Sequence, residues 1–224
     1  MVRDAVFDRG AAMSDEIVLY THPMSRGRIA RWMLEEIGQP YRVELLEYGT
    51  TMKAPAYLAI NPMGKVPTIV HRNTIVTEAC AICAYLADAF PDAGLAPPPD
   101  DPARGGYYRW MFFAAGPVEA AVSNKSLGFD VPQERRAMVG YGSIDEVMNA
   151  LEFAVSQQDY LAGNSFTAAD VYVGSQIGWG MMFGMIEKRP AFESYWKRIG
   201  NRPAALRARG IDDALLRDMQ ERAQ

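Results

Sequence analysis

The sequence predicts an α/β domain over residues 16–92, followed by an all-helical domain over residues 103–224. The length of 224 residues corresponds to about one and a half domains of ~150 residues. Strand patterns alternate with helical periodicity only in the first part of the chain, which is typical of an α/β domain. Residues 93–102 (AGLAPPPDDP) contain three consecutive prolines, which cannot continue a helix and indicate a stiff linker.

The first domain is expected to follow the order β-α-β-α-β-β-α. Residues 17–20 (IVLY) form a continuous apolar run, which is typical of a strand covered on both faces. Apolar side chains then recur at helical spacing as far as Gly38, a residue type that commonly ends helices. Residues 41–45 alternate between apolar and charged side chains, as strands do. The strands are expected at residues 17–20, 41–45, 67–70 and 74–76, and the helices at residues 29–37, 53–60 and 78–90.

The second domain shows helical patterns and no strand pattern. Gly116 and Pro117 should kink or break its first helix, because proline lacks a backbone N–H. Thr167 and Asp170 have the spacing of a capping box, which predicts the start of a buried helix. The helices are expected at residues 103–123, about 133–158, 168–187 and 190–200.

Composition and charge exclude several classes of protein. The net charge of −4 argues against a nucleic-acid partner, and two cysteines and two histidines exclude a disulfide scaffold, a zinc-finger array and a His-rich metal site, so no metal is predicted. Residues 1–15 are charged throughout, lack the apolar stretch of a signal peptide and are expected to form a short mobile extension. The longest uncharged run, Val171–Ile186, is shorter than the ~18–20 residues that span a bilayer. We therefore expect a cytoplasmic protein with no membrane partner.

The segment from Tyr20 to Arg28 joins the first strand to the first helix, and it places Ser25 at the N-terminus of that helix. Free backbone N–H groups and the helix dipole favour an anion at this point. A hydroxyl here can hold a thiolate or a phosphate by a charge-assisted hydrogen bond. An ordinary N-cap is the alternative interpretation, since serine is a favoured capping residue.

Two further segments carry weaker signals. Val66–Pro67 opens a strand after a turn, where the peptide bond could be cis or where a trans proline could form an edge. Glu78 and Ala79 open the next helix, whose N–H groups would present a second anion site, although an acidic residue also simply stabilises a helix N-terminus. Cys80 and Cys83 form a CxxC motif inside an apolar helix, where core packing is favoured over redox chemistry.

Taken together, these segments resemble the cytosolic glutathione S-transferase family. Residues 61–69 (NPMGKVPTI) are similar to the family's proline segment, and residues 166–171 (FTAADV) to the capping motif of its helical domain. The residues from Tyr20 to Ser25 resemble the glutaredoxin active-site lead-in, with Ser25 in place of the nucleophilic cysteine and Arg28 in place of the second cysteine. The resemblance implies a thioredoxin-like first domain, of the bacterial type with serine at the active site, and an all-helical second domain.

The resemblance also implies a site for glutathione as co-substrate. Ser25 would hydrogen-bond the glutathione sulfur and lower its pKa, with Tyr20 and Thr21 as alternatives, because other branches of the family use a tyrosine near the end of the first strand. The implied binding residues are Lys53 and Lys65 at the glycyl carboxylate, Val66 at the cysteinyl backbone next to a cis Pro67, and Glu78 with the N–H of Ala79 at the γ-glutamyl end.

Ala79 departs from the family pattern, which usually has serine or threonine at this position. The lost hydrogen bond to a charged group corresponds to about 1.5–3 kcal/mol, and this predicts weaker glutathione binding or a compensating neighbour.

The activity that the resemblance implies is glutathione transfer, in which the thiolate attacks an apolar electrophile. Detoxification and a homodimer follow from the family. Other glutathione-dependent chemistry (peroxidase, isomerase or dehalogenase) and a non-catalytic interaction protein of the same fold are the alternatives. A thiol oxidoreductase is less favoured because it needs cysteine at position 25.

Overall fold

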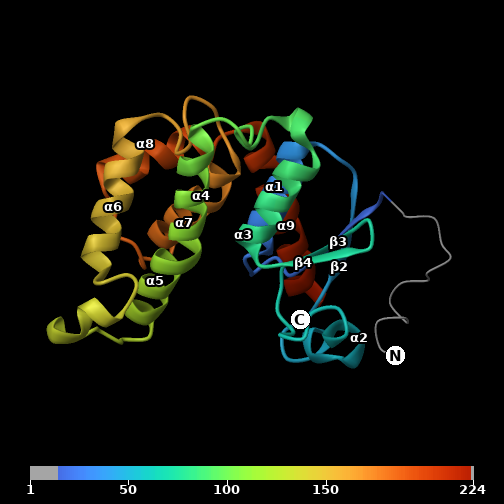
Figure 1. Cartoon of the computed structure of the whole chain (residues 1–224). Helices are drawn as coiled ribbons and strands as arrows, with labels where there is room; N and C mark the ends of the chain where they lie inside the picture. The colour runs from blue at the N-terminus through green and yellow to red at the C-terminus, as the bar shows by residue number, and fades with distance from the viewer. Residues whose placement is uncertain (1–14, 223–224) are drawn as a thin grey trace. The chain divides into compact units, whose positions relative to one another are not determined.

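The computed structural model describes residues 15–222, so the predicted extension at residues 1–15 lies almost wholly outside the described residues. The chain divides into two compact units (Figure 1). The first unit consists of the residues up to Ala89 and those from Ala204 onwards, and the second unit runs from Phe90 to Pro203.

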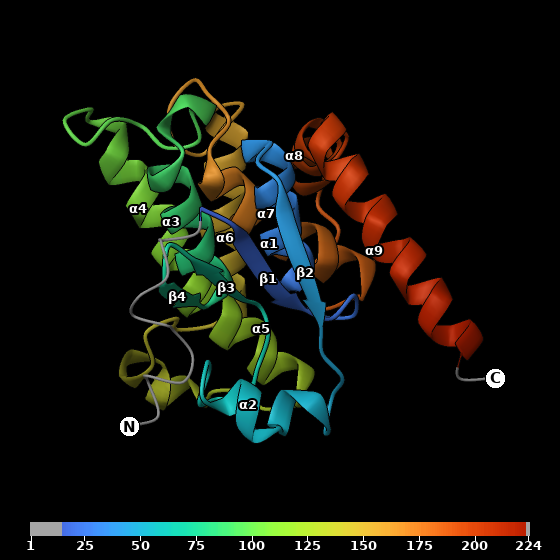
Figure 2. The same cartoon turned by 90° about the vertical axis from the view of Figure 1, so that its right-hand side faces the viewer.

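A four-stranded mixed sheet forms the centre of the first unit. Its strands are β1 (Ile17–Thr21), β2 (Tyr41–Leu45), β3 (Thr68–His71) and β4 (Thr74–Thr77). They lie in the order β2-β1-β3-β4 (Figure 2), with β1 parallel to β2 and the other neighbours antiparallel. The predicted β-α-β-α-β-β-α order and the thioredoxin-like fold class are confirmed.

The strand register brings three chain segments to one edge of the sheet. Tyr20 pairs with Thr68, and Thr68 pairs with Thr77. The end of β1, the beginning of β3 and the end of β4 therefore lie side by side. The segments that follow β1, precede β3 and follow β4 start or finish at this common edge.

The helices of this part are α1 (Gly27–Ile37), the short η2 (Thr51–Lys53) and α2 (Pro55–Leu58), and α3 (Ala79–Ala89). Helix α1 packs against α3, and both bury apolar side chains such as Leu34 and Ile82. Helix α1 ends as predicted at Gly38, which has a φ of 69° and donates its N–H to the Leu34 carbonyl. The start of both long helices lies at the edge where β1 and β4 end.

The second unit is all-helical in residues 90–203, as the sequence predicts. Its first expected helix contains a wider turn, because Pro117 has no N–H to donate and a π-turn accommodates it. Leu95 of the predicted linker is buried, and its carbonyl accepts the N–H of Ala168 at 2.8 Å. The elements are η3 (Pro91–Ala93), α4 (Ala103–Phe113), the π-turn η4 (Ala114–Val118), α5 (Glu119–Ser126), η5 (Gln133–Met138), α6 (Ile144–Gln157), α7 (Ala168–Met182) and α8 (Pro190–Ile199).

Two predicted helix boundaries are wrong. A continuous helix over residues 133–158 is interrupted, because the chain leaves η5 after Met138 and turns through Gly142, which has a φ of 65°. Helix α6 then begins after Ser143, whose hydroxyl accepts the Glu146 N–H at 3.3 Å. Helix α7 ends at Met182 instead of residue 187, just before Gly184, which has a φ of 69°.

Helix α9 (Pro203–Arg222) is a helix that the sequence patterns did not predict. The sequence predicts a helical domain over residues 103–224, whereas the structure groups Ala204 and the residues beyond it with the first unit. The physical reason is a set of charged contacts with α1, in which Asp212 pairs with Arg31 and Asp213 pairs with Arg28. Among residues 15–222, no helix is both long and apolar enough to cross a membrane.

Candidate functional site

The candidate site lies at the sheet edge where β1 and β4 end and β3 begins. The loop after β1 carries Ser25, the segment before β3 carries Val66 and Pro67, and Glu78 follows β4 directly. The Val66–Pro67 peptide bond is cis. The structure thus brings together the three segments that the sequence singled out separately.

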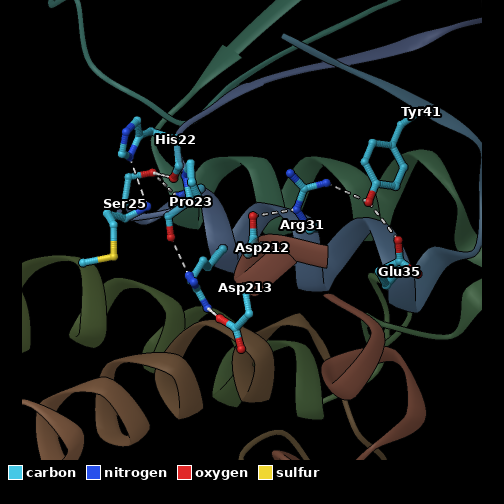
Figure 3. Close-up of polar contacts among 11 residues, drawn as sticks. His22, Pro23, Ser25, Arg31, Glu35, Tyr41, Asp212 and Asp213 are labelled. Carbon is cyan, nitrogen blue, oxygen red and sulfur yellow. Dashed lines mark hydrogen bonds and ion pairs between the residues drawn. The ribbon is translucent and has the colours of Figure 1, made fainter. Parts of the chain in front are cut away.

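Ser25 precedes α1 and is partly exposed. Its hydroxyl donates to the His22 carbonyl at 2.6 Å and accepts the Gly27 N–H at 2.9 Å (Figure 3). The N-cap residue of α1 is Arg26 and not Ser25, and it makes no side-chain cap. Ser25 instead accepts the N–H of the first helical residue from one position further out, next to the free N–H groups of α1 that favour an anion. A serine hydroxyl has one proton to donate, so it can serve a bound anion only by turning away from the His22 carbonyl.

Gly27 permits this arrangement because it has no side chain. A Cβ atom at this position would overlap the Thr21 hydroxyl and would lie 2.9 Å from the Ser25 hydroxyl. The glycine after Arg26 is therefore required by close approach of the β1 end to the start of α1.

The two alternative hydroxyls occupy different surroundings. Thr21 is fully buried, so its hydroxyl is closed to solvent. Tyr20 points to the opposite face of the strand, and its ring packs 5.5 Å from that of Tyr57. Burial, followed by the charge of Glu44, raises the pKa of Tyr20, so its hydroxyl keeps its proton. Of these three hydroxyls, that of Ser25 is the one that is both partly exposed and next to the start of α1.

His22 and Tyr48 brace the Ser25 loop, and sequence reasoning missed both roles. The Met24 N–H donates to Nδ1 of His22 at 3.0 Å, and the Tyr48 hydroxyl donates to the Met24 carbonyl at 3.0 Å. The two rings pack against each other at an angle of 57° with their centroids 4.6 Å apart, and Nε2 of His22 lies 3.6 Å from the Glu47 carboxylate. Partial burial raises the pKa of Tyr48, although Arg26 and Ser25 oppose that shift. No local pattern links the loop after β2 to the loop after β1, so sequence spacing carried no signal for this contact.

The cis-proline segment is held by two side chains that the sequence did not identify as functional. The Lys65 carbonyl accepts hydrogen bonds from the Tyr57 hydroxyl at 2.5 Å and from Nδ2 of Asn61 at 2.8 Å. Both side chains also bond the Thr68 hydroxyl at the start of β3. Within residues 15–222, the N–H and carbonyl of Val66 have no hydrogen-bond partner. This leaves Val66 able to pair with an extended ligand, as an added strand does.

The two candidate lysines differ in whether the ammonium group already has a hydrogen-bond partner. Nζ of Lys53 donates to the Met63 carbonyl at 2.9 Å. Lys65 is exposed, and its ammonium group has no partner in the part of the chain that the structure describes. Lys65 is therefore the cation that is more readily available to a ligand carboxylate at this edge.

Glu78 has a left-handed backbone with a φ of 67°, which is unusual for a residue other than glycine. Its carbonyl accepts the Ile82 N–H at 2.8 Å, and its exposed carboxylate has no partner within residues 15–222. Such a conformation costs about 1–3 kcal/mol and occurs most often where function requires it. Ala79 is buried as the first residue of α3. The strained residue therefore presents an unpaired carboxylate beside a helix N-terminus.

The comparisons with known proteins agree with this geometry. The chain matches the family models described as "Glutathione S-transferase, N-terminal domain" over residues 24–89 and "Glutathione S-transferase, C-terminal domain" over residues 122–203. Glutathione S-transferase 1 of Schizosaccharomyces pombe is 30% identical to it, over 68% of this chain and 69% of that protein. The chain belongs to the glutathione S-transferase family.

Other members of the glutathione S-transferase family match almost the whole length. Glutathione S-transferase GST-4.5 of Xanthomonas campestris pv. campestris is 25% identical, over 87% of this chain and 99% of that protein. A solved sphingomonad glutathione S-transferase, complexed with glutathione, has a TM-score of 0.72 and 27% identity, over 88% of this chain and 98% of that chain. Both domain matches and the named relatives identify the protein as an enzyme of this family.

The CxxC motif of this glutathione S-transferase lies in α3. Burial raises the pKa of Cys80 to about 12 and that of Cys83 well above its ordinary value. Neither thiol is therefore a thiolate at neutral pH, and the pair lacks the activation that a redox motif needs. Among residues 15–222, no group of three or more His, Cys, Asp or Glu side chains is arranged to hold a metal ion.

Proposed function

We propose that this enzyme binds glutathione along the edge formed by the Ser25 loop, Val66–Pro67 and Glu78, and conjugates it through its sulfur to an apolar electrophile. The observation that carries the proposal is the partly exposed Ser25 hydroxyl at the start of α1, on the same edge as the cis-proline and the strained Glu78. The glutathione bound to the sphingomonad relative supports the choice of co-substrate. A homodimer and a cytoplasmic location complete the proposal, and both rest on the family alone.

Each part of glutathione has a complementary group in this edge. The unpaired N–H and carbonyl of Val66 suit the cysteinyl backbone, and the exposed Glu78 carboxylate suits the γ-glutamyl amine. The N-terminus of α3 at Ala79 suits the γ-glutamyl carboxylate. The exposed Lys65 ammonium, and less directly that of Lys53, suits the glycyl carboxylate. This direction of binding leaves the cysteinyl sulfur toward Ser25.

The chemistry requires the thiolate form of glutathione. The thiol proton leaves to solvent, and the N-terminus of α1 stabilises the resulting negative charge. The Ser25 hydroxyl turns from the His22 carbonyl to the sulfur, while the Gly27 N–H keeps the serine oxygen in place. The sulfur then forms a bond to the electrophilic carbon, and the bond from that carbon to its leaving group breaks with its electron pair.

The test combines calorimetry with glutathione and initial rates with a panel of electrophiles. Ser25→Ala should lower the rate at pH 7 by about 10- to 100-fold, since a lost hydrogen bond to a charged group raises the thiol pKa by about 1–2 units. Glutathione binding should stay largely intact, because the other contacts remain. Ser126→Ala is the matched control, since that exposed hydroxyl donates only to the Ser123 carbonyl of its own helix.

Three outcomes would contradict parts of this proposal. No binding at millimolar glutathione would favour a non-catalytic protein of the same fold, an alternative to which the missing hydroxyl at Ala79 contributes. An unchanged rate in Ser25→Ala would transfer the role to another hydroxyl, with Tyr20 and Thr21 tested next. Turnover of hydroperoxides, isomerisable substrates or halides without conjugation of other electrophiles would indicate a different glutathione-dependent reaction.

A further inference from the structure

The loop that carries Ser25 is connected to the C-terminal helix through one arginine. Arg28, in the first turn of α1, donates from Nε to the Pro23 carbonyl at 2.5 Å. Its Nη1 donates to the Asp213 carboxylate of α9 at 2.7 Å (Figure 3). The guanidinium group is planar and rigid, so fixing one end of it also fixes the direction of the other donor.

The Pro23 carbonyl is a sensitive point of this loop. Proline has no N–H, so the carbonyl is the one backbone hydrogen-bonding group of this residue. Pro23 lies between His22, whose carbonyl accepts the Ser25 hydroxyl, and Met24, whose N–H bonds the His22 ring. Tilting the Pro23 peptide therefore tilts the peptides of both neighbours and displaces the serine oxygen.

We propose that Asp213 and Arg28 are positioning residues for Ser25, and that α9 thereby sets the reactivity of the glutathione sulfur. The proposal rests on the proposed function of Ser25. Asp213 orients the Arg28 guanidinium, Arg28 holds the Pro23 carbonyl, and this carbonyl keeps the Ser25 loop in register with α1. Neither Asp213 nor Arg28 touches the substrate in this scheme.

The adjacent aspartates of α9 have separate roles in this arrangement. The side chains of Asp212 and Arg31 are almost fully buried, each 1% exposed, and their ion pair holds α9 on α1. The side chains of Asp213 and Arg28 are 44% and 19% exposed. A partly exposed ion pair contributes little to stability, so removing the charge of Asp213 should leave α9 in place.

The first measurement is hydrogen exchange on the unliganded enzyme, comparing Asp213→Asn with Asp218→Asn. Asp218 is an exposed residue of the same helix without a partner within residues 15–222, so its substitution makes the same charge change. We expect faster exchange at the amides of residues 22–27 in Asp213→Asn and no change there in Asp218→Asn. The melting temperatures of both variants should match that of the unchanged enzyme.

The second measurement follows the bound sulfur. The ultraviolet absorbance of the glutathione thiolate gives the pKa of the bound thiol, and it should rise in Asp213→Asn by part of the amount seen in Ser25→Ala. The turnover number should fall about tenfold, which is less than the ~100-fold loss that a misplacement of about 1 Å can cause, while glutathione binding stays largely intact. Arg28→Lys keeps the charge but loses the rigid planar group that joins the Pro23 carbonyl to the Asp213 carboxylate, so it should have the same effect. The double variant should be no worse than the poorer single variant, because both act through one path.

Equal exchange at residues 22–27 in Asp213→Asn and Asp218→Asn would overturn the inference, whether or not the enzyme transfers glutathione. Faster exchange along the whole of α9 and α1 would also overturn it, because Asp213 would then act in docking the helix. Failure of the unchanged enzyme to bind glutathione or form the thiolate would instead refute the proposed function, while the exchange experiment would still decide the role of Asp213.

Discussion

The buried ion pair between Arg31 and Asp212 should be the main anchor of α9. The Nε of Arg31 lies 2.9 Å from the Asp212 carboxylate, and Nη1 of Arg31 donates to the Tyr41 hydroxyl at 3.2 Å. Asp212→Asn removes one charge and leaves the guanidinium buried at the same place. Breaking a buried ion pair in this way costs about 3–5 kcal/mol of stability. The remaining Arg31 charge is still buried away from water, but no opposite charge compensates for that burial.

The size of this effect makes the measurement direct. For a protein of this length, about 1 kcal/mol lowers the melting temperature by roughly 2–4 °C, so Asp212→Asn should lower it by about 6–20 °C. Urea unfolding followed by far-ultraviolet circular dichroism gives the free energy of unfolding, because the helices of both units contribute to the signal. Asp218→Asn is again the control, with an expected loss below about 0.5 kcal/mol.

A double variant separates two quantities: the cost of leaving the Arg31 charge buried without Asp212, and the net contribution of the ion pair to stability. Replacing both residues, as Arg31→Met with Asp212→Leu, should recover most of the stability lost in Asp212→Asn, because well-packed apolar side chains often equal a buried ion pair. A loss in Asp212→Asn as small as that in Asp218→Asn would refute the reasoning. A double variant as unstable as the single one would show that the pair itself, and not the stranded guanidinium, carries the energy.

Three further predictions concern the site and the helical unit. Gly27→Ala should cost about 1–3 kcal/mol in urea unfolding and lower the transfer rate, because the new methyl group displaces the hydroxyls of Thr21 and Ser25; normal stability and rate would show that the close approach is not limiting. Ala79→Ser should tighten glutathione binding by about 10- to 100-fold in calorimetry, since it restores a hydrogen bond of about 1.5–3 kcal/mol to a charged group; equal affinity would show that a neighbour already compensates. Burial raises the pKa of Asp170, so the folded protein holds this proton more tightly than the unfolded chain does. The free energy of unfolding of the unchanged enzyme, minus that of Asp170→Asn, should therefore decrease as pH rises through the raised pKa. An increase of this difference over the same pH range would refute the direction.

The segments that the sequence predicted well are those with local patterns. The apolar run of β1, the helical spacing that ends at Gly38 and the alternation in β2 each depend on neighbouring residues alone. The order of these elements then determines that the ends of β1 and β4 meet the start of β3. The grouping of Ser25, Pro67 and Glu78 at one edge could therefore be anticipated, given the family's strand order.

The features that escaped the sequence analysis depend on contacts between distant residues. Helix α9 docks through Asp212 and Asp213, which are about 180 positions from their partners (181 and 185), and charged contacts of this kind leave no apolar stripe to detect. The contact between the Tyr48 and His22 rings joins two loops that show no periodicity in the sequence. The break before α6 arises from a single left-handed Gly142 inside an otherwise helical composition.

The hydrogen bond from Ser25 to the His22 carbonyl has a consequence for the end of the catalytic cycle. In the proposed reaction this carbonyl competes with the glutathione sulfur for a single proton. A thiolate is a strong acceptor and wins the competition, whereas the thioether sulfur of a conjugate is a weak acceptor and loses it. The serine therefore returns to the carbonyl once the carbon–sulfur bond has formed. If Ser25 acts as proposed, the enzyme would distinguish substrate from product by the charge on the sulfur atom, and the loop that binds the thiolate would hold the conjugate less tightly.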